Sequence, residues 1–219
     1  MSADWETDKA LLAAWRAGES TAGRQLYERH CDAVIRVFEN KLGAEAEDLI
    51  QQTFLALVRT RDALREGTTV RAYLLTTARN LLIDHLRKRG RAGGPPLDLE
   101  QVSIADLEPG PSSIIARRRE QQLLLAALRA IPVEHQLALE LHYWEGLPAA
   151  EIAEIVGISH SAMRSRMVRA RELLHAQLRR LAETPQLVES TLDGLEKWAR
   201  GIREVKGSGP WSGGGGSGS

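Results

Sequence analysis

The sequence lacks several features that would each point to a particular class of protein. Cys31 is the only cysteine, which excludes an internal disulfide and a cysteine-rich zinc site. No apolar run approaches the roughly 20 residues that a membrane-spanning helix needs, and the first residues do not follow a signal-peptide pattern. We therefore expect no membrane insertion, and a single free thiol is typical of a protein in the reducing cytoplasm.

Signals of catalysis are also missing. The chain has no clustered carboxylates at metal-ligand spacing, no glycine-rich phosphate loop and no evident pairing of a nucleophile with a base. His30 and Cys31 lie inside an apolar helical pattern without further ligands at metal spacing, which favours packing over metal binding. We expect no enzymatic activity, no metal and no cofactor.

A net charge is absent too, because 29 basic residues balance 29 acidic ones. The charge is unevenly distributed, however. Residues 61–94 hold 8 basic and 3 acidic side chains, and residues 159–181 hold 6 basic and 1 acidic. Two separate basic segments suggest that nucleic acid is held at two places. A solvated helix face is the commoner explanation of any one such run.

The most informative stretch runs from Leu147 to Leu174. It contains two helical patterns separated by a short break at Gly157, which suits a left-handed helix end, and Ser159, which suits an N-cap. This arrangement predicts a helix-turn-helix, whose second helix enters the DNA major groove. The apolar side of that second helix consists of Met163, Met167, Ala170 and Leu174. The opposite side carries Ser161, Arg164, Ser165 and Val168, flanked by Arg169.

Apolar periodicity predicts further helices within residues 4–42, over 44–60 and 70–89, within 114–145 and over 185–205. In the first two regions the expected inward side chains include Tyr27, Ile50, Phe54, Leu57 and Val58. The helix over 70–89 combines cations with Tyr73 and Asn80, a mixture that suits single-stranded nucleic acid. The helix over 185–205 is amphipathic, and two interpretations stay open. Either it packs Leu195 and Trp198 on the preceding domain, or it is a regulatory extension.

Glycine and proline mark the domain boundaries. The fold class is all-α, with two small helical domains at residues 1–90 and 114–183. A flexible acidic linker is expected at 91–113, where the charged side chains are all acidic apart from Arg91. A C-terminal helical extension follows at 184–206. Residues 207–219 form a Gly/Ser-rich tail typical of disorder or of an added linker.

Three motifs together resemble the extracytoplasmic-function (ECF) sigma factors of bacterial RNA polymerase, in the sigma-70 family. The motifs are AEDLIQQTF at 46–54, YLLTTARNLLIDHLRKR at 73–89 and EGLPAAEIAEIVGISHSAMRSRMVRAREL at 145–173. The resemblance covers residues 9–181, and the order of the motifs and the linker between them also fit. It implies that residues 1–90 form sigma region 2 and residues 114–183 form sigma region 4.

The resemblance also implies partners and site residues. A sigma factor binds core RNA polymerase, at the β′ clamp helices and the β flap, and binds promoter DNA; an anti-sigma factor is a further possible partner by analogy alone. The implied core-binding residues are Asp48, Leu49, Gln51, Gln52 and Phe54, with Gln52 in place of the usual Glu. The implied minus-ten residues are Arg65, Tyr73, Arg79, Asn80, Asp84, Arg87 and Lys88. The implied minus-thirty-five residues are His160, Ser161, Arg164, Ser165, Arg166, Val168 and Arg169.

Within region 2, the resemblance makes the loop at 61–69 the family's specificity loop, which with Asn80 receives a base flipped from the non-template strand. The function expected is therefore promoter recognition and DNA melting at the start of transcription. The alternative is a helix-turn-helix regulator that does not engage polymerase. In that case Asp48 and Gln51 would be ordinary surface residues, and replacing them would leave function intact.

Overall fold

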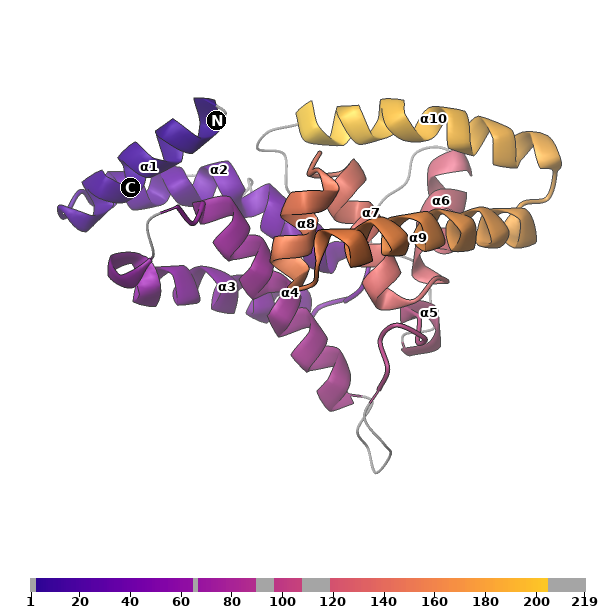
Figure 1. The fold of residues 1–219 in the computed structure, drawn as a ribbon, viewed down its shortest axis with the longest axis horizontal. Helices are drawn as coiled ribbons and strands as arrows, with labels where there is room; N and C mark the ends of the chain where they lie inside the picture. Colours follow the sequence, from indigo (N-terminus) through magenta and orange to yellow (C-terminus); the bar gives the residue numbers. More distant parts are fainter. Residues whose placement is uncertain (1–2, 65–66, 90–96, 108–118, 205–219) are drawn as a thin grey trace, which may run out of the picture.

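The computed structural model describes residues 3–64, 67–89, 97–107 and 119–204. Within these residues the fold is all-α, with a single isolated bridge between Ser103 and Pro132 as its only extended pairing. Figure 1 shows the first four helices gathered at one end of the molecule and α6 to α9 at the other, with α10 lying along the second group. The prediction of an all-α fold is confirmed.

The N-terminal helices are α1 (Ala3–Arg16), α2 (Ser20–Glu39), α3 (Ala46–Thr60) and α4 (Val70–Arg89), with a short 3-10 helix, η1 (Arg61–Ala63), after α3. Helix α2 packs against α1, α3 and α4, so it is the centre of this group. Its Leu26, Val34 and Phe38 are fully buried. Helix α1 is joined to α2 by the buried carboxylate of Asp8, whose two oxygens lie 2.8 Å from Arg29 Nε and from His30 Nε2.

Two expected core positions are wrong. Tyr27 and Val58 are 45% and 47% exposed, and the buried stripe of α3 is instead Leu49, Thr53 and Leu57. Thr53 can be buried because its hydroxyl donates to the Leu49 carbonyl at 2.8 Å and so needs no water. The stripe is therefore rotated by one residue, and Ile50 and Phe54 are half-buried.

The C-terminal helices are α6 (Arg119–Arg129), α7 (Val133–Tyr143), α8 (Ala149–Val156) and α9 (His160–Leu181). The predicted turn between α8 and α9 is confirmed: Gly157 has φ of +78° and its N–H donates to the Ala153 carbonyl. Ser159 caps α9 by accepting from the Ala162 N–H at 3.2 Å. These local bonds satisfy both helix ends without help from the rest of the chain.

Part of the expected flexible linker is structured. Residues 97–107 include α5 (Ile104–Leu107), and the side chains of Leu99 and Ile104 are buried. The carbonyls of Leu99 and Val102 accept hydrogen bonds from the N–H groups of Glu134 and Val133. Composition suggested a free tether, but two apolar anchors hold this stretch to the start of α7.

Helix α10 (Pro185–Glu204) lies against α6, α7 and α9. Leu195 is buried, and the Trp198 ring packs edge-on against Trp144 with 5.0 Å between ring centres. Of the two interpretations of this helix, the packing one is confirmed. The Gly/Ser-rich tail lies outside the described residues.

Candidate nucleic-acid interface

Helix α9 exposes the side that the sequence assigned to DNA. Met163, Met167, Ala170 and Leu174 are buried, whereas Ser161, Arg164, Ser165 and Val168 are exposed. His160 and Arg169 are exposed as well, and Arg169 forms an ion pair with Glu172 at 3.1 Å. Cations and hydroxyls projecting from one face of a helix after a tight turn have the layout of a major-groove reader.

Arg166 differs from its neighbours on α9. Its side chain is 12% exposed and turns back toward α7, where it pairs with Glu134, and toward the linker, where it pairs with Glu100. In this arrangement Arg166 is removed from the exposed face and contacts carboxylates in place of DNA.

Helix α4 presents a second basic surface. Asn80, Asp84, Arg87 and Lys88 are all exposed along it, and the Asn80 side-chain carbonyl accepts from Arg79 at 3.1 Å. Tyr73 is half-buried at the other end of the helix, where its hydroxyl bonds to Thr60 at 3.0 Å. Tyr73 thus ties the end of α3 to α4, on either side of the loop at 61–69. Arg65 lies outside the described residues.

Arg79 does not share the exposure of these neighbours. Its side chain is 17% exposed and forms an ion pair with Glu134 at the start of α7. Glu134 thus contacts one arginine from each predicted DNA-binding surface, Arg79 on α4 and Arg166 on α9. A carboxylate at this position occupies the same donors that a DNA phosphate would use.

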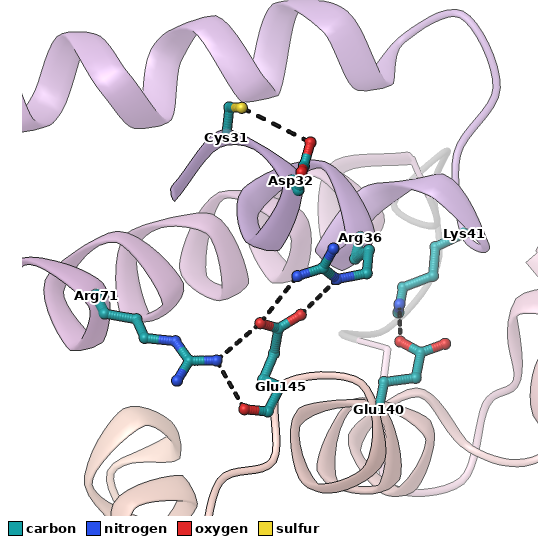
Figure 2. Close-up of polar contacts among 7 residues, drawn as sticks. All are labelled: Cys31, Asp32, Arg36, Lys41, Arg71, Glu140 and Glu145. Carbon is teal, nitrogen blue, oxygen red and sulfur yellow. Dashed lines mark hydrogen bonds and ion pairs between the residues drawn. The ribbon is translucent and has the colours of Figure 1, made fainter. Parts of the chain in front are cut away.

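Further ion pairs join the two groups of helices, as Figure 2 shows. Glu145, which is buried, accepts from Arg36 at 2.6 Å and from Arg71 at 2.9 Å. Fully buried Lys41 pairs with Glu140 on α7. The C-terminal domain therefore contributes three carboxylates, from Glu134, Glu140 and Glu145, and the N-terminal domain contributes at least one cationic partner to each of them.

The Glu145 carboxyl is ionised in this arrangement. Burial raises its pKa, but hydrogen bonds and positive charge from Arg36 and Arg71 outweigh burial and bring the pKa below its ordinary value. Sequence reasoning did not identify Glu134, Glu140 or Glu145. They are spaced six and five residues apart, so no single-helix periodicity marks them as a group.

Helix α3 carries the residues assigned to core polymerase. Asp48, Gln51 and Gln52 are exposed, and Gln52 donates to Asp48 at 2.6 Å. Leu49 is 7% exposed and packs into the core, so it does not share the outer face with them. Phe54 is half-buried and packs on Tyr27 with 4.6 Å between ring centres. Beside it lies an apolar groove, whose lining includes Trp15, Tyr27, Phe54, Leu57 and Val58.

Two features of other protein classes are absent from the described part of the chain. There, no three His, Cys, Asp or Glu side chains gather in a way that would hold a metal ion. Over the same residues, no helix combines the length and the apolar character needed to cross a membrane.

Comparison with known proteins adds to this geometry. Residues 26–92 match the family described as Sigma-70 region 2, and residues 121–174 match Sigma-70, region 4. Two solved structures are similar at TM-scores of 0.57 and 0.52. One is of CnrH in complex with the cytosolic domain of CnrY, at 22% identity over 80% of this chain and 99% of that one. The other is of the sigma factor RpoE with the anti-sigma factor NepR from Bartonella quintana, at 24% identity over 71% and 93%. These two show the fold alone.

Several relatives are similar in sequence. The chain is 33% identical to the RNA polymerase sigma factor CarQ of Myxococcus xanthus, over 76% of this chain and 95% of CarQ. It is 31% identical to the ECF RNA polymerase sigma factor SigE of Mycolicibacterium smegmatis, over 82% and 67%. It is 32% identical to the ECF RNA polymerase sigma factor BldN of Streptomyces coelicolor, over 73% of this chain but only 61% of BldN. The similarity to CarQ and to the ECF sigma factor SigE, together with the two region matches, shows that the chain belongs to the ECF sigma factors of the sigma-70 family.

Proposed function

We propose that this chain binds core RNA polymerase, directs it to promoters with two recognition elements and promotes melting of the DNA between them. The observation that carries the proposal is the presence of two separate basic surfaces, on α4 and on α9, in two domains of one chain. A plain helix-turn-helix regulator has no need of the first of these.

The surface on α9 reads duplex DNA. Arg164 and Arg169 reach guanine edges or phosphates, the hydroxyls of Ser161 and Ser165 bond to bases or backbone, and Val168 contacts a thymine methyl group. His160, at the first position of α9, contacts the DNA backbone. Each well-made bidentate base contact is worth about 1–3 kcal/mol of discrimination.

The surface on α4 binds the melted strand. A sigma factor has no ATP-driven step, so binding energy must favour the open form. A flipped base held near Asn80 and the loop at 61–69 supplies this energy, with stacking worth about 1–3 kcal/mol per base. Arg87 and Lys88 neutralise nearby phosphates, and Arg79 joins them once it leaves Glu134.

The outer face of α3 docks core polymerase. Asp48, Gln51 and Gln52 provide polar contacts, and the apolar groove beside Phe54 provides the burial that an interface centre needs. Leu49 supports this face from inside the core.

The C-terminal domain binds the β flap. The cytoplasm, where the polymerase works, is the proposed compartment. An anti-sigma partner is proposed by analogy, because the two similar structures are complexes with another protein. In the RpoE complex, that protein is the anti-sigma factor NepR.

The contact between the two domains explains why the free chain is expected to bind promoter DNA weakly. Glu134 holds Arg79 and Arg166, so DNA must displace a carboxylate before it gains either arginine. Polymerase overcomes this barrier by holding both domains near the DNA, which raises their effective concentration. Specific binding of promoter duplex by the isolated chain at physiological salt would contradict this part of the proposal.

The test is binding and transcription with purified core polymerase. Asp48→Ala combined with Gln51→Ala should weaken core binding at least about tenfold, the effect of losing roughly 1.4 kcal/mol at an interface. Glu189→Gln, an exposed change on α10, serves as the control. If the double variant binds core and supports transcription like the wild type, these α3 residues do not dock the polymerase. If the wild type itself does not bind core, the chain is a DNA-binding regulator that does not engage polymerase.

A further inference from the structure

The loop at 61–69 is held at its start by α1, an element that lies before the residues matched to region 2. The Arg16 guanidinium donates from Nε to the Arg61 carbonyl at 2.7 Å and from Nη2 to the Leu64 carbonyl at 3.0 Å. The two carbonyls belong to residues 45 and 48 positions away. One planar side chain therefore fixes two points of the backbone where it leaves α3.

A second contact reinforces the first. The Arg61 guanidinium lies over the Trp15 ring, 5.1 Å from its centre, a cation–π arrangement. Trp15 is in turn seated against α2, where Gly23 leaves room for the indole. A Cβ on Gly23 would lie only 2.6 Å from the Trp15 ring. Gly23 is thus required for the close approach of α1 to α2.

Helix α1 is itself firmly attached to α2, so it can act as a support. The buried carboxylate of Asp8 accepts from Arg29 and shares a hydrogen bond with His30. Burial opposes ionisation of Asp8, but these two partners outweigh burial and lower its pKa. Asp8, near the middle of α1, attaches this helix to α2, and Arg16, its last residue, contacts the loop.

We propose that Arg16 is a positioning residue for promoter reading, which sets the backbone of the minus-ten specificity loop by bonding to the carbonyls of Arg61 and Leu64. This inference rests on the proposed function, because it assigns the loop to the minus-ten element. Arg16 touches no DNA in this role. It acts by keeping residues 61–64, the start of the loop, in one arrangement, and a segment with one arrangement discriminates between bases better than a segment with several.

The chemistry of Arg16 makes the role specific to arginine. Its planar fork presents two donors in a fixed geometry, whereas a lysine ammonium is a single point with rotating donors. Arg16→Lys keeps the charge and one of the two bonds, and should retain part of the selectivity. Arg16→Ala loses both. Lys9, an exposed cation on the same helix, provides the matched control as Lys9→Ala.

The first measurement is hydrogen exchange in the free protein, which does not depend on polymerase. Arg16→Ala should speed amide exchange at residues 61–64 by roughly three- to tenfold, the effect of losing one or two partly exposed hydrogen bonds. Lys9→Ala should leave exchange there unchanged. Unchanged exchange in Arg16→Ala would overturn the proposal whatever the chain does in transcription.

The second measurement is transcription by core polymerase from promoters randomised at the minus-ten element. Arg16→Ala should flatten the base preference there, lowering the ratio of preferred to other bases by roughly three- to tenfold. Preference at the minus-thirty-five element and affinity for core should stay as in the wild type. A uniform loss of transcription with an unchanged base preference would show a merely structural role and overturn the proposal.

A second variant guards against a folding artefact. Gly23→Ala keeps the Arg16 side chain, but the added Cβ displaces Trp15 and so shifts α1 away from the loop, while alanine itself favours the α2 helix by about 1 kcal/mol over glycine. It should flatten the minus-ten preference in the same way without loss of folded protein, and an unchanged preference would contradict the support by α1. If wild-type protein directs no transcription with core, the proposed function fails, and the exchange result still decides whether Arg16 positions the loop.

Discussion

The two proposed DNA-binding surfaces of this protein are built in opposite ways. The surface on α9 is local: one helix presents all the exposed residues proposed to contact DNA there, and Gly157 and Ser159 set its start within a few residues. The surface around α4 depends on distant parts of the chain. Arg16 supports its loop from 45 residues away, and Glu134 engages its Arg79 from 55 residues away.

The difference teaches where each surface is vulnerable. A surface made by one capped helix fails only when its own residues change or its core is disturbed. A surface assembled from remote contacts can be altered without touching any residue that meets DNA. Such a surface can also be occupied by another part of the same chain, since Glu134 of α7 forms an ion pair with Arg79. The changes below test this contrast, beginning with the largest expected effect.

Lys41→Met should cause the largest loss of stability, because it removes the cationic partner of buried Glu140 and leaves Gln136 as its remaining side-chain partner in the described part of the chain. Breaking a buried pair in this way costs about 3–5 kcal/mol. Chemical denaturation measures the loss, and small-angle scattering shows whether the domains separate. Arg24→Ala, which breaks an exposed pair with Glu28, should change the unfolding free energy by less than about 1 kcal/mol. Equal effects of the two variants would contradict the importance of the buried contact.

Arg164→Ala should lower transcription from promoters with an intact upstream element by roughly ten- to a hundredfold, as expected for a base contact worth about 1–3 kcal/mol. The minus-ten preference should not change, since the two surfaces are separate. Arg179→Ala, an exposed cation in the last turn of α9, provides the control. A change in minus-ten preference with Arg164→Ala would contradict the independence of the local surface.

Glu134→Gln should strengthen binding of DNA by the free chain several-fold, because it releases Arg79 and removes one of the two carboxylates that hold Arg166, the other being Glu100. Each phosphate newly neutralised adds about 0.9 to the slope of log affinity against log salt, so the slope should steepen by about 0.9 through Arg79. Titration of labelled promoter DNA across salt concentrations measures this slope. Glu189→Gln, which removes the same charge from an exposed site on α10, should leave the slope unchanged.

Acid should weaken the contact between the domains through Glu145. Its pKa is lowered in the folded chain, so its contribution to stability is complete above the ordinary value of 4.5 and is lost as pH falls through the lowered one. Unfolding of the wild type and of Glu145→Gln should therefore differ at neutral pH and converge in acid. A difference that persists in strong acid would mean that the charge of Glu145 is not what the contact uses.

The contrast between the surfaces also decides what the sequence could predict. The turn at Gly157, the cap at Ser159 and the buried and exposed sides of α9 follow from residues a few positions apart, and all were predicted. The roles of Arg16, Glu134 and Glu145 could not be, because each depends on a partner from another helix. The burial of Leu99 and Ile104 could not be predicted for a related reason. Two apolar residues in a polar stretch show no helical periodicity, and they are buried by packing in the folded chain.

The side of α3 shows the same limit on a smaller scale. The helix itself was predicted, but its inward face was not: Leu49, Thr53 and Leu57 are buried, and Val58 is exposed. Thr53 can be buried because its hydroxyl donates to the Leu49 carbonyl of its own helix.

The most direct test of the central claim is transcription from a library randomised at both promoter elements, with core polymerase in the presence and absence of this protein. Two surfaces on one chain predict transcripts that depend on the protein and share two upstream elements at a fixed spacing. Core polymerase that gains no transcripts, or gains transcripts enriched for only one element, would contradict the account.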